Sequence, residues 1–269
     1  MAKVELGTCH ICGKYGKLSF DHVPPEAAFN DHRVLRISFE QVSVGQHPDN
    51  LRGRYQQRGA GASTLCVKCN SDTGHWYGTA YADWAAQAMR ILLGTSGRPS
   101  LEYPFRLFPL RVLKQVVCMF FSINSPLFHT RQPDLVRFVL NKEEKNFPAD
   151  VRVYAFYTLS DRSRTASVSG VLKGLGSSSS SVHVFSEVTF PPFGFVMTLG
   201  NSPPPQSGFC EISSFSKFDY RDCRTFTMKL RLMPIYTLFP GDYRTRDVTL
   251  ADAAESERRW REAGMPPLT

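Results

Sequence analysis

No stretch of the sequence approaches the roughly 18 consecutive apolar residues that a transmembrane helix needs. The N-terminal residues Met-Ala-Lys-Val-Glu-Leu-Gly also lack the apolar core of a secretory signal peptide. The chain contains no internal repeat. We therefore expect a cytoplasmic protein without a membrane partner, in a compartment that keeps thiols reduced.

Cysteine is scarce outside two short motifs. Four of the seven cysteines form the pairs Cys9/Cys12 and Cys66/Cys69, and three are scattered: Cys118, Cys210 and Cys223. In a reducing compartment two Cys-x-x-Cys pairs indicate a metal site rather than disulfides. Zinc prefers four tetrahedral ligands, and each pair can place two thiolates on one ion. We predict a structural zinc with no position open to water, and three scattered cysteines that act as small buried side chains.

Acidic residues are fewer than basic ones, 24 against 32. The formal net charge is +8, and the sequence pI is about 9.2. This balance favours a polyanionic partner, although many basic proteins bind nothing acidic. The length allows one large domain or two small ones.

Hydrophobic periodicity divides the chain near residue 95. Helical spacing of apolar residues predicts helices over residues 75–94, 110–123, 134–141 and 251–262, with a proline-punctuated linker over 96–109. Alternating patterns predict strands over residues 151–157, 182–190, 193–199 and 226–232. We expect an α+β protein: a zinc-bound module in residues 1–95, then an α+β region with an antiparallel sheet in residues 96–269.

The segment between the cysteine pairs carries the residues suited to chemistry. Leu18-Ser-Phe-Asp-His-Val-Pro-Pro25 predicts a short strand that the two prolines end. Asp21 and His22 are adjacent on it, and Asn70 directly follows Cys69. An imidazole can activate water near neutral pH. Oxygen ligands from Asp21 and Asn70 suit Mg²⁺ or Mn²⁺, and the alternative role of Asn70 is a helix N-cap.

Residues 9–74 resemble the HNH endonuclease family through Cys-x-x-Cys, Asp-His-x-x-Pro and Leu-Cys-x-x-Cys-Asn. The resemblance implies a treble-clef-like ββα-metal fold that hydrolyses phosphodiester bonds in DNA and leaves 5′-phosphate ends. It implies that His22 is the general base and that Asp21 and Asn70 hold one catalytic divalent cation. The resemblance also implies a setting in mobile elements, restriction or phage defence.

One family residue is absent from its expected position. The middle Asn of the family, which braces a loop, lies about five residues before the second cysteine pair. Residues 59–65 contain no Asn, and Asn50 is the nearest one upstream. This departure leaves two further hypotheses open: a non-catalytic zinc-dependent nucleic-acid-binding module, or a protein-interaction domain in which zinc only supports the fold.

Several basic residues could contact phosphates around this site. They are Lys17, Arg52, Arg54, Arg58 and Lys68, with His75 as a further phosphate contact or metal ligand. The alternative for the arginine-rich stretch is a solvated loop. We expect DNA as the partner, with RNA left open, and residues 96–269 as the region that binds the target, a partner protein or a second copy of the chain.

Overall fold

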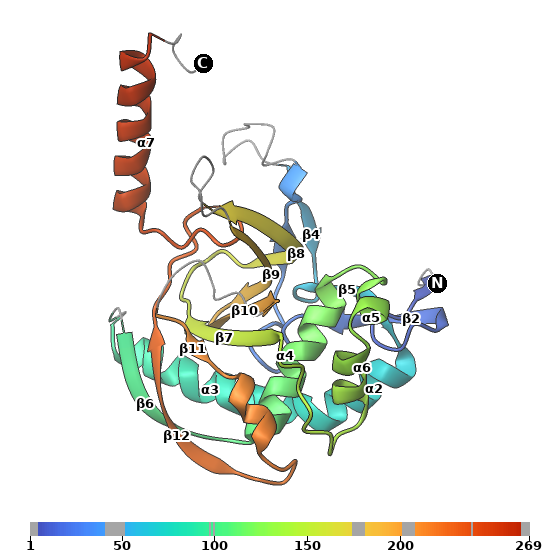
Figure 1. Ribbon diagram of the computed structural model, residues 1–269. Coiled ribbons are helices and arrows are strands. Elements are labelled where there is room, and N and C mark those ends of the chain that lie inside the picture. The colour runs from blue at the N-terminus through green and yellow to red at the C-terminus, as the bar shows by residue number, and fades with distance from the viewer. Residues whose placement is uncertain are drawn as a thin grey trace.

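The computed structural model describes residues 5–40, 52–96, 98, 100–173, 181–200, 208–237 and 239–264, with the side chains of 171–173 and 181 left out. It combines helices with antiparallel sheets, as the α+β prediction requires (Figure 1). None of the described helices combines the length and apolar character needed to cross a bilayer.

A small antiparallel sheet forms the N-terminal part, in the order β1-β2-β5. Its strands are β1 (Leu6–Thr8), β2 (Tyr15–His22) and β5 (Gly61–Cys66). Helix α2 (Val67–Thr73) starts directly after β5 and continues through a π-helical turn, η2 (Gly74–Gly78), into α3 (Thr79–Gly94). The predicted strand before the prolines and the predicted helix ending at Gly94 are both confirmed.

Between β2 and β5 the chain forms a two-stranded ribbon, β3 (Val34–Arg36) and β4 (Arg54–Gln56). Asn50 lies between these strands and outside the described residues.

The larger sheet has five antiparallel strands in the order β11-β7-β10-β9-β8. They are β7 (Val151–Tyr157), β8 (Arg164–Lys173), β9 (Ser181–Phe190), β10 (Phe193–Leu199) and β11 (Cys210–Glu211). The predicted strands at 151–157, 182–190 and 193–199 are confirmed. Strand β8 was not predicted, because its small and polar residues hide the alternation and a bulge between Ala166 and Ser169 breaks it.

The predicted linker over residues 96–109 is wrong, because β6 (Ser100–Leu107) pairs along its whole length with β12 (Arg224–Arg231). Leu101, Phe105 and Leu107 are buried, with exposed residues between them, as a half-buried strand requires. Pro104 suggested a linker, but a proline is tolerated in a strand that has one partner. The strand predicted over 226–232 is confirmed as β12.

Helix α4 (Pro109–Ile123) lies at the centre of the molecule, between the two sheets (Figure 1). Nearly every residue of α4 is buried, as its apolar sequence predicts. Three shorter helical segments pack around it: α5 (Phe128–Arg131), α6 (Pro133–Leu140) and the 3₁₀ segment η3 (Ser213–Lys217). The short helix predicted over 134–141 is confirmed as α6.

One hydrophobic cluster extends across the predicted boundary at residue 95. Trp84 of α3 stacks on Phe193 of β10 with 3.9 Å between ring centroids. Tyr81 lies against Phe195 at 6.0 Å. The division into two domains stays a prediction about folding units, while the side chains on its two sides share a core.

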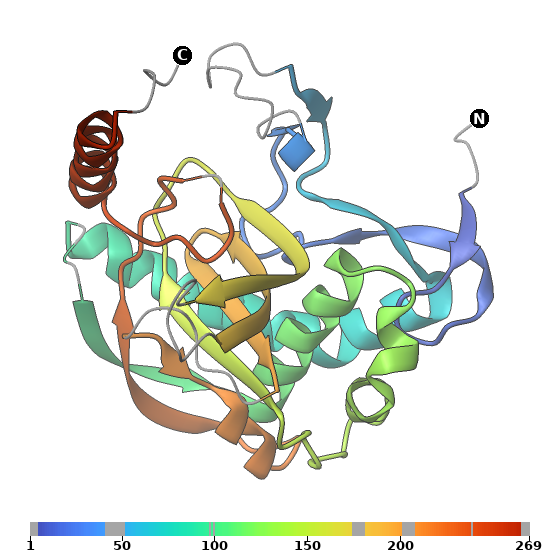
Figure 2. The same ribbon diagram turned by 45° about the horizontal axis from the view of Figure 1, so that its top comes forward.

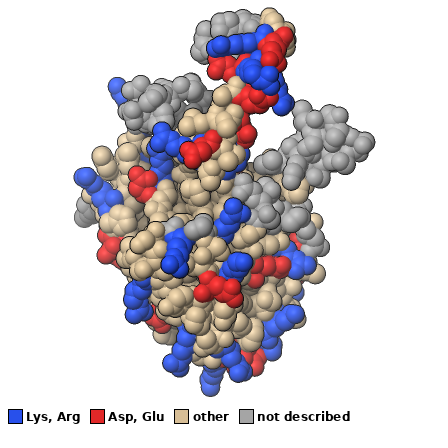
Figure 3. Space-filling view, turned by 90° about the vertical axis from the view of Figure 1, so that its left-hand side faces the viewer, with Lys and Arg blue, Asp and Glu red and all other residues tan. Residues whose placement is uncertain are grey.

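Helix α7 (Arg246–Glu262) has no buried residue and projects from the body (Figures 1 and 2). It contains the predicted helix at 251–262 and starts earlier, where Thr245 Oγ1 accepts from the Val248 amide. Acidic and basic side chains alternate along it (Figure 3), and i,i+4 pairs such as Arg258 with Glu262 support it.

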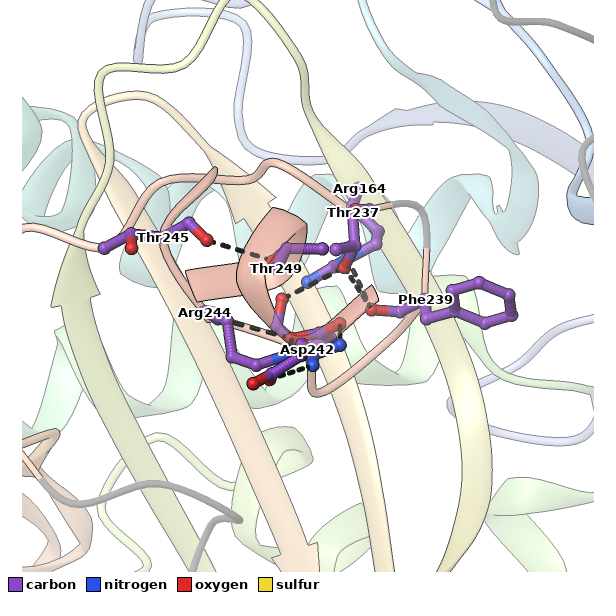
Figure 4. A network of polar contacts seen from close by, with 8 residues as sticks. Arg164, Thr237, Phe239, Asp242, Arg244, Thr245 and Thr249 are labelled. Carbon is purple, nitrogen blue, oxygen red and sulfur yellow. Dashed lines mark hydrogen bonds and ion pairs between the residues drawn. The ribbon is translucent and has the colours of Figure 1, made fainter. Parts of the chain in front are cut away.

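A buried ion pair holds the loop that leads into α7. Arg164 Nε lies 2.6 Å from Glu187 Oε1, and both side chains are buried. Arg164 Nη1 donates to the carbonyls of Thr237 and Phe239, at 2.8 and 2.7 Å. Figure 4 shows the contacts of Arg164 with Thr237 and Phe239 beside the pairing of Arg244 with Asp242. The base of α7 is therefore fixed to the large sheet.

Candidate functional site

The four cysteines of the two motifs come together in space. Their Sγ atoms all lie within 4.8 Å of one another, and those of Cys12 and Cys66 are 3.9 Å apart. Zn–S bonds of about 2.3 Å in a tetrahedron place the sulfurs about 3.8 Å apart. The donor set and its spacing therefore fit zinc. Over the described parts of the chain, no other group of three or more His, Cys, Asp or Glu is arranged this closely.

Local backbone geometry builds each half of this cluster. Gly13 has φ +71°, and its amide donates to the Cys9 carbonyl at 2.9 Å, which closes the first turn. In the second half, Cys66 caps α2 and its Sγ accepts from the Cys69 amide at 3.4 Å. A negative charge on this sulfur is favourable at a helix N-terminus. The two halves join the β1–β2 turn to the β5–α2 junction.

The thiols of the cluster interact strongly with one another. A hydrogen bond from Cys69 lowers the pKa of Cys9 to about 4, and the same bond raises the pKa of Cys69. Of the three scattered cysteines, Cys118 is buried as predicted, whereas Cys210 and Cys223 are only partly buried.

A second group of polar residues lines a cavity of about 570 Å³ beside the end of β2. Asp21, His22 and Asn70 all line it, and the four cluster cysteines do not. Other polar side chains also line the cavity: Glu26, Thr73, Thr79, Asp83 and Gln115. The structure thus places the three residues singled out in the sequence around one cavity, which the sulfur cluster does not line.

His22 is held by a backbone carbonyl. Its Nε2 lies 2.7 Å from the Arg58 carbonyl oxygen, and its ring lies edge-on to Phe20 with centroids 4.9 Å apart. Because a carbonyl can only accept, Nε2 carries the proton of the neutral imidazole and Nδ1 keeps a lone pair. This tautomer leaves Nδ1 able to take a proton from water.

Asp21 turns toward α4, where its Oδ2 accepts a hydrogen bond from the Ser122 hydroxyl. Burial raises the pKa of this carboxyl to about 7, against the opposing effect of the Ser122 bond. A bound cation would stabilise a carboxylate whose ionisation burial makes costly. The surroundings of Asp21 therefore fit a cation ligand.

Asn70 lies in the second turn of α2, so the alternative role as a helix N-cap is wrong: Cys66 caps the helix. Asn70 Nδ2 donates to Ser19 Oγ at 3.1 Å and to the Phe20 carbonyl at 2.9 Å. These bonds fix α2 against β2 and use the donor side of the amide. The oxygen side remains as a ligand of the kind that Mg²⁺ and Mn²⁺ prefer.

Asn30 was not among the residues selected from the sequence. It is fully buried, and its Nδ2 donates to the carbonyls of Pro24 and Ala60 at 2.6 and 2.8 Å. Its Oδ1 accepts from the Ala60 amide at 2.6 Å. Asn30 thus ties the chain after β2 to the segment that leads into β5. It supplies a loop brace, although residues 59–65 contain no Asn. No local pattern around Asn30 indicated this role.

Gly59 makes the close approach to Asn30 feasible. Its φ is +81°, and a Cβ at this position would collide with the Asn30 carbonyl oxygen. A glycine is therefore required where the two segments meet.

The predicted phosphate-contacting residues lie on or beside four different elements, and none of them lines the cavity. Three of them are exposed on or beside β4: Arg52, Arg54 and Arg58. The backbone carbonyl of Arg58 accepts the hydrogen bond from His22. Lys68 is exposed but pairs with Asp72, with 2.6 Å between Nζ and Oδ2. Two others are also exposed: Lys17 on β2 and His75 in η2.

No protein-family model matches the chain, and comparisons with curated proteins and with solved structures returned no match. The features of the chain that point to a function are therefore the geometry of the site and the motifs of residues 9–74.

Proposed function

We propose that the protein is a metal-dependent endonuclease of the HNH type that hydrolyses phosphodiester bonds in DNA. The observation that carries the proposal is that Asp21, His22 and Asn70 line one cavity, apart from a sulfur cluster suited to structural zinc. The order of β2, β5 and α2 is the one that a ββα-metal module needs.

His22 is the general base. Its Nδ1 takes a proton from water, and the water oxygen forms a bond to phosphorus as the bond from phosphorus to the 3′ oxygen breaks. The departing oxygen takes a proton from solvent, which leaves a 5′-phosphate and a 3′-hydroxyl. The hydrogen bond to the Arg58 carbonyl stabilises the imidazolium that forms, because Nε2 keeps its proton throughout.

Asp21 and Asn70 would hold the divalent cation, Mg²⁺ or Mn²⁺, through carboxylate and amide oxygens. When bound, this cation neutralises charge on the phosphate and on the leaving oxygen. Ser122 orients the Asp21 carboxylate from α4. Ser19 and the Phe20 carbonyl orient the Asn70 amide from β2.

Structural zinc has a different role in this proposal. Four sulfur ligands leave no position for water, so the ion stabilises the fold and takes no part in hydrolysis. The ion joins α2 to the turn before β2. Helix α2 carries Asn70, and strand β2 carries Asp21 and His22. Loss of zinc would therefore disturb the catalytic geometry indirectly.

The test is cleavage of supercoiled plasmid DNA by purified protein with Mg²⁺ or Mn²⁺. We expect His22→Ala to abolish cleavage, with a loss of about 10²-fold or more, as for removal of a general base. Zinc content and melting temperature of the variant should match those of the parent protein, because the His22 ring is only partly buried. Equal cleavage by His22→Ala would refute the proposal. Absence of metal-dependent cleavage in the parent protein would favour a non-catalytic binding module.

A further inference from the structure

The β3–β4 ribbon carries an excess of exposed positive charge. We define the arginine ribbon as residues 33–36 and 52–58. Its five arginines are all exposed: Arg33, Arg36, Arg52, Arg54 and Arg58. None of the five pairs with a carboxylate within the described ranges, and the ribbon itself contains no acidic residue. Arg33 and Arg36 were not among the residues expected to contact phosphate.

The register of the ribbon separates two faces. Arg36 is the cross-strand partner of Arg54, so their side chains leave the same face of the ribbon. Leu35 and Tyr55 are partners on the other face, where the Arg33 guanidinium lies 4.4 Å from the centre of the Tyr55 ring. Like charges directly opposite each other destabilise a strand pair. A polyanion bound on the Arg36/Arg54 face would offset that cost.

The ribbon is connected firmly to the candidate catalytic residues. Arg58, at its end, accepts the hydrogen bond from His22, and Gln56 Nε2 donates to the Gly61 carbonyl at 2.8 Å. Phe39 packs against Phe239 with 5.9 Å between ring centroids, which joins the adjoining segment to the rest of the protein.

We infer that the arginine ribbon binds the backbone of duplex DNA and places a phosphodiester at His22. This inference rests on the proposed function. A two-stranded antiparallel ribbon has the width to enter the major groove of B-form DNA. Arginine guanidinium groups bind phosphate oxygens through paired hydrogen bonds. The contacts are with phosphates, so binding has little dependence on base sequence.

The experiment measures binding separately from cleavage. The protein carries His22→Ala and is kept in buffer without Mg²⁺ or Mn²⁺, and a short fluorescein-labelled duplex reports binding by anisotropy. We expect Arg36→Gln with Arg54→Gln to weaken duplex binding about 30-fold near 0.15 M salt, because two phosphate contacts are lost. The slope of log K against log salt should fall by about 1.8 for the same reason.

A matched control removes the same charge elsewhere. Arg131→Gln with Arg162→Gln changes two exposed arginines that lie outside the ribbon, and it should weaken binding by less than about threefold through net charge alone. Arg36→Lys with Arg54→Lys keeps the charge and should retain most of the affinity. Zinc content and melting temperature check that each variant is folded.

Three results would overturn the inference. The first two are that the ribbon variant binds like the control variant or that it binds like the parent. The third is that a single-stranded DNA or RNA probe binds as tightly as the duplex and loses as much affinity in the ribbon variant. The proposed function fails separately, if duplex binding depends on the ribbon but the protein with His22 intact cleaves no DNA with Mg²⁺ or Mn²⁺.

Discussion

Asn30 holds both sides of Ala60, accepting from its amide at 2.6 Å and donating to its carbonyl at 2.8 Å. The same Ala60 carbonyl accepts from the Val23 amide at 2.9 Å, one residue after His22. The strand that carries His22 is therefore tied to the segment between β4 and β5, which carries the Arg58 carbonyl. Because the tautomer of His22 depends on that carbonyl, Asn30 is a positioning residue for the candidate base.

Replacing Asn30 with Ala should lower both stability and cleavage. The Ala60 amide would lose its acceptor in a buried place, and we expect the free energy of unfolding to fall by about 2–4 kcal/mol. Urea denaturation measures the first effect, and kcat measured separately from KM measures the second. A fall in kcat with KM nearly unchanged would indicate misplaced His22 rather than weaker DNA binding.

Asn146→Ala is the matched control, because Asn146 is exposed and its described hydrogen bond is made by the backbone amide. It should change neither quantity. If Asn30→Ala were as stable and active as this control, the bracing role of Asn30 would be wrong.

Removal of zinc should destabilise the whole protein. The cluster joins the β1–β2 turn to α2, and its cysteines belong to the main hydrophobic cluster. We expect Cys66→Ser to lower zinc content below one ion per chain and to lower the melting temperature by roughly 10 °C, equivalent to about 3–4 kcal/mol. Cys223→Ser, which changes a cysteine outside the cluster, should leave zinc content unchanged. Full stability of the zinc-free protein would contradict a structural role.

Asp21→Asn should separate stability from activity. The change removes a charge whose burial is unfavourable, and the Ser122 hydroxyl can still donate to the new amide oxygen. In buffer without divalent cations at pH 8 we expect a melting temperature equal to or above that of the parent. Plasmid cleavage should fall by about 10²-fold or more, since one cation ligand is lost. A variant that cleaves normally would show that Asp21 does not hold the cation.

Lys114 should make the stability of the protein depend on pH, independently of the candidate catalytic residues. Its Nζ donates to the carbonyls of Phe138 and Asn141 at the end of α6, and burial lowers the pKa of Lys114 to about 7. Between this value and the unfolded pKa of about 10.4, the unfolded state binds more protons. The contribution of Lys114 to stability is therefore least favourable below pH 7 and rises as the pH increases toward 10.

The measurement is the free energy of unfolding from pH 6.5 to 9.5 for the parent and for Lys114→Met. The free energy of unfolding of the parent should increase relative to that of the variant as the pH rises, by at most about 1.4 kcal/mol per pH unit. The hydrogen bonds to two carbonyls favour the charged ammonium and reduce this slope. A difference that stays constant across the range would show that Lys114 has an ordinary pKa in the folded protein.

Some features could be predicted from sequence because they depend on neighbours in the chain. The Cys-x-x-Cys spacing places two sulfurs on one side of a tight turn, whatever the rest of the fold. The alternation in residues 151–157 and the apolar surface of residues 110–123 likewise require a strand and a buried helix. Asp21 and His22 stand on the predicted strand before the proline pair. Their proposed chemistry follows from residue type and from adjacency.

Other features depend on residues that only folding brings together. Ser122 reaches Asp21 across 101 positions and Asn30 reaches Ala60 across 30, so neither contact leaves a local pattern. Strand β6 was hidden for the same reason, since its partner β12 lies far along the chain. Sequence alone determined which side chains can bind zinc, hold a cation or take a proton. Tertiary structure alone decided which of them share a cavity, because hydrogen-bond donors and acceptors find distant partners only when burial removes water as an alternative.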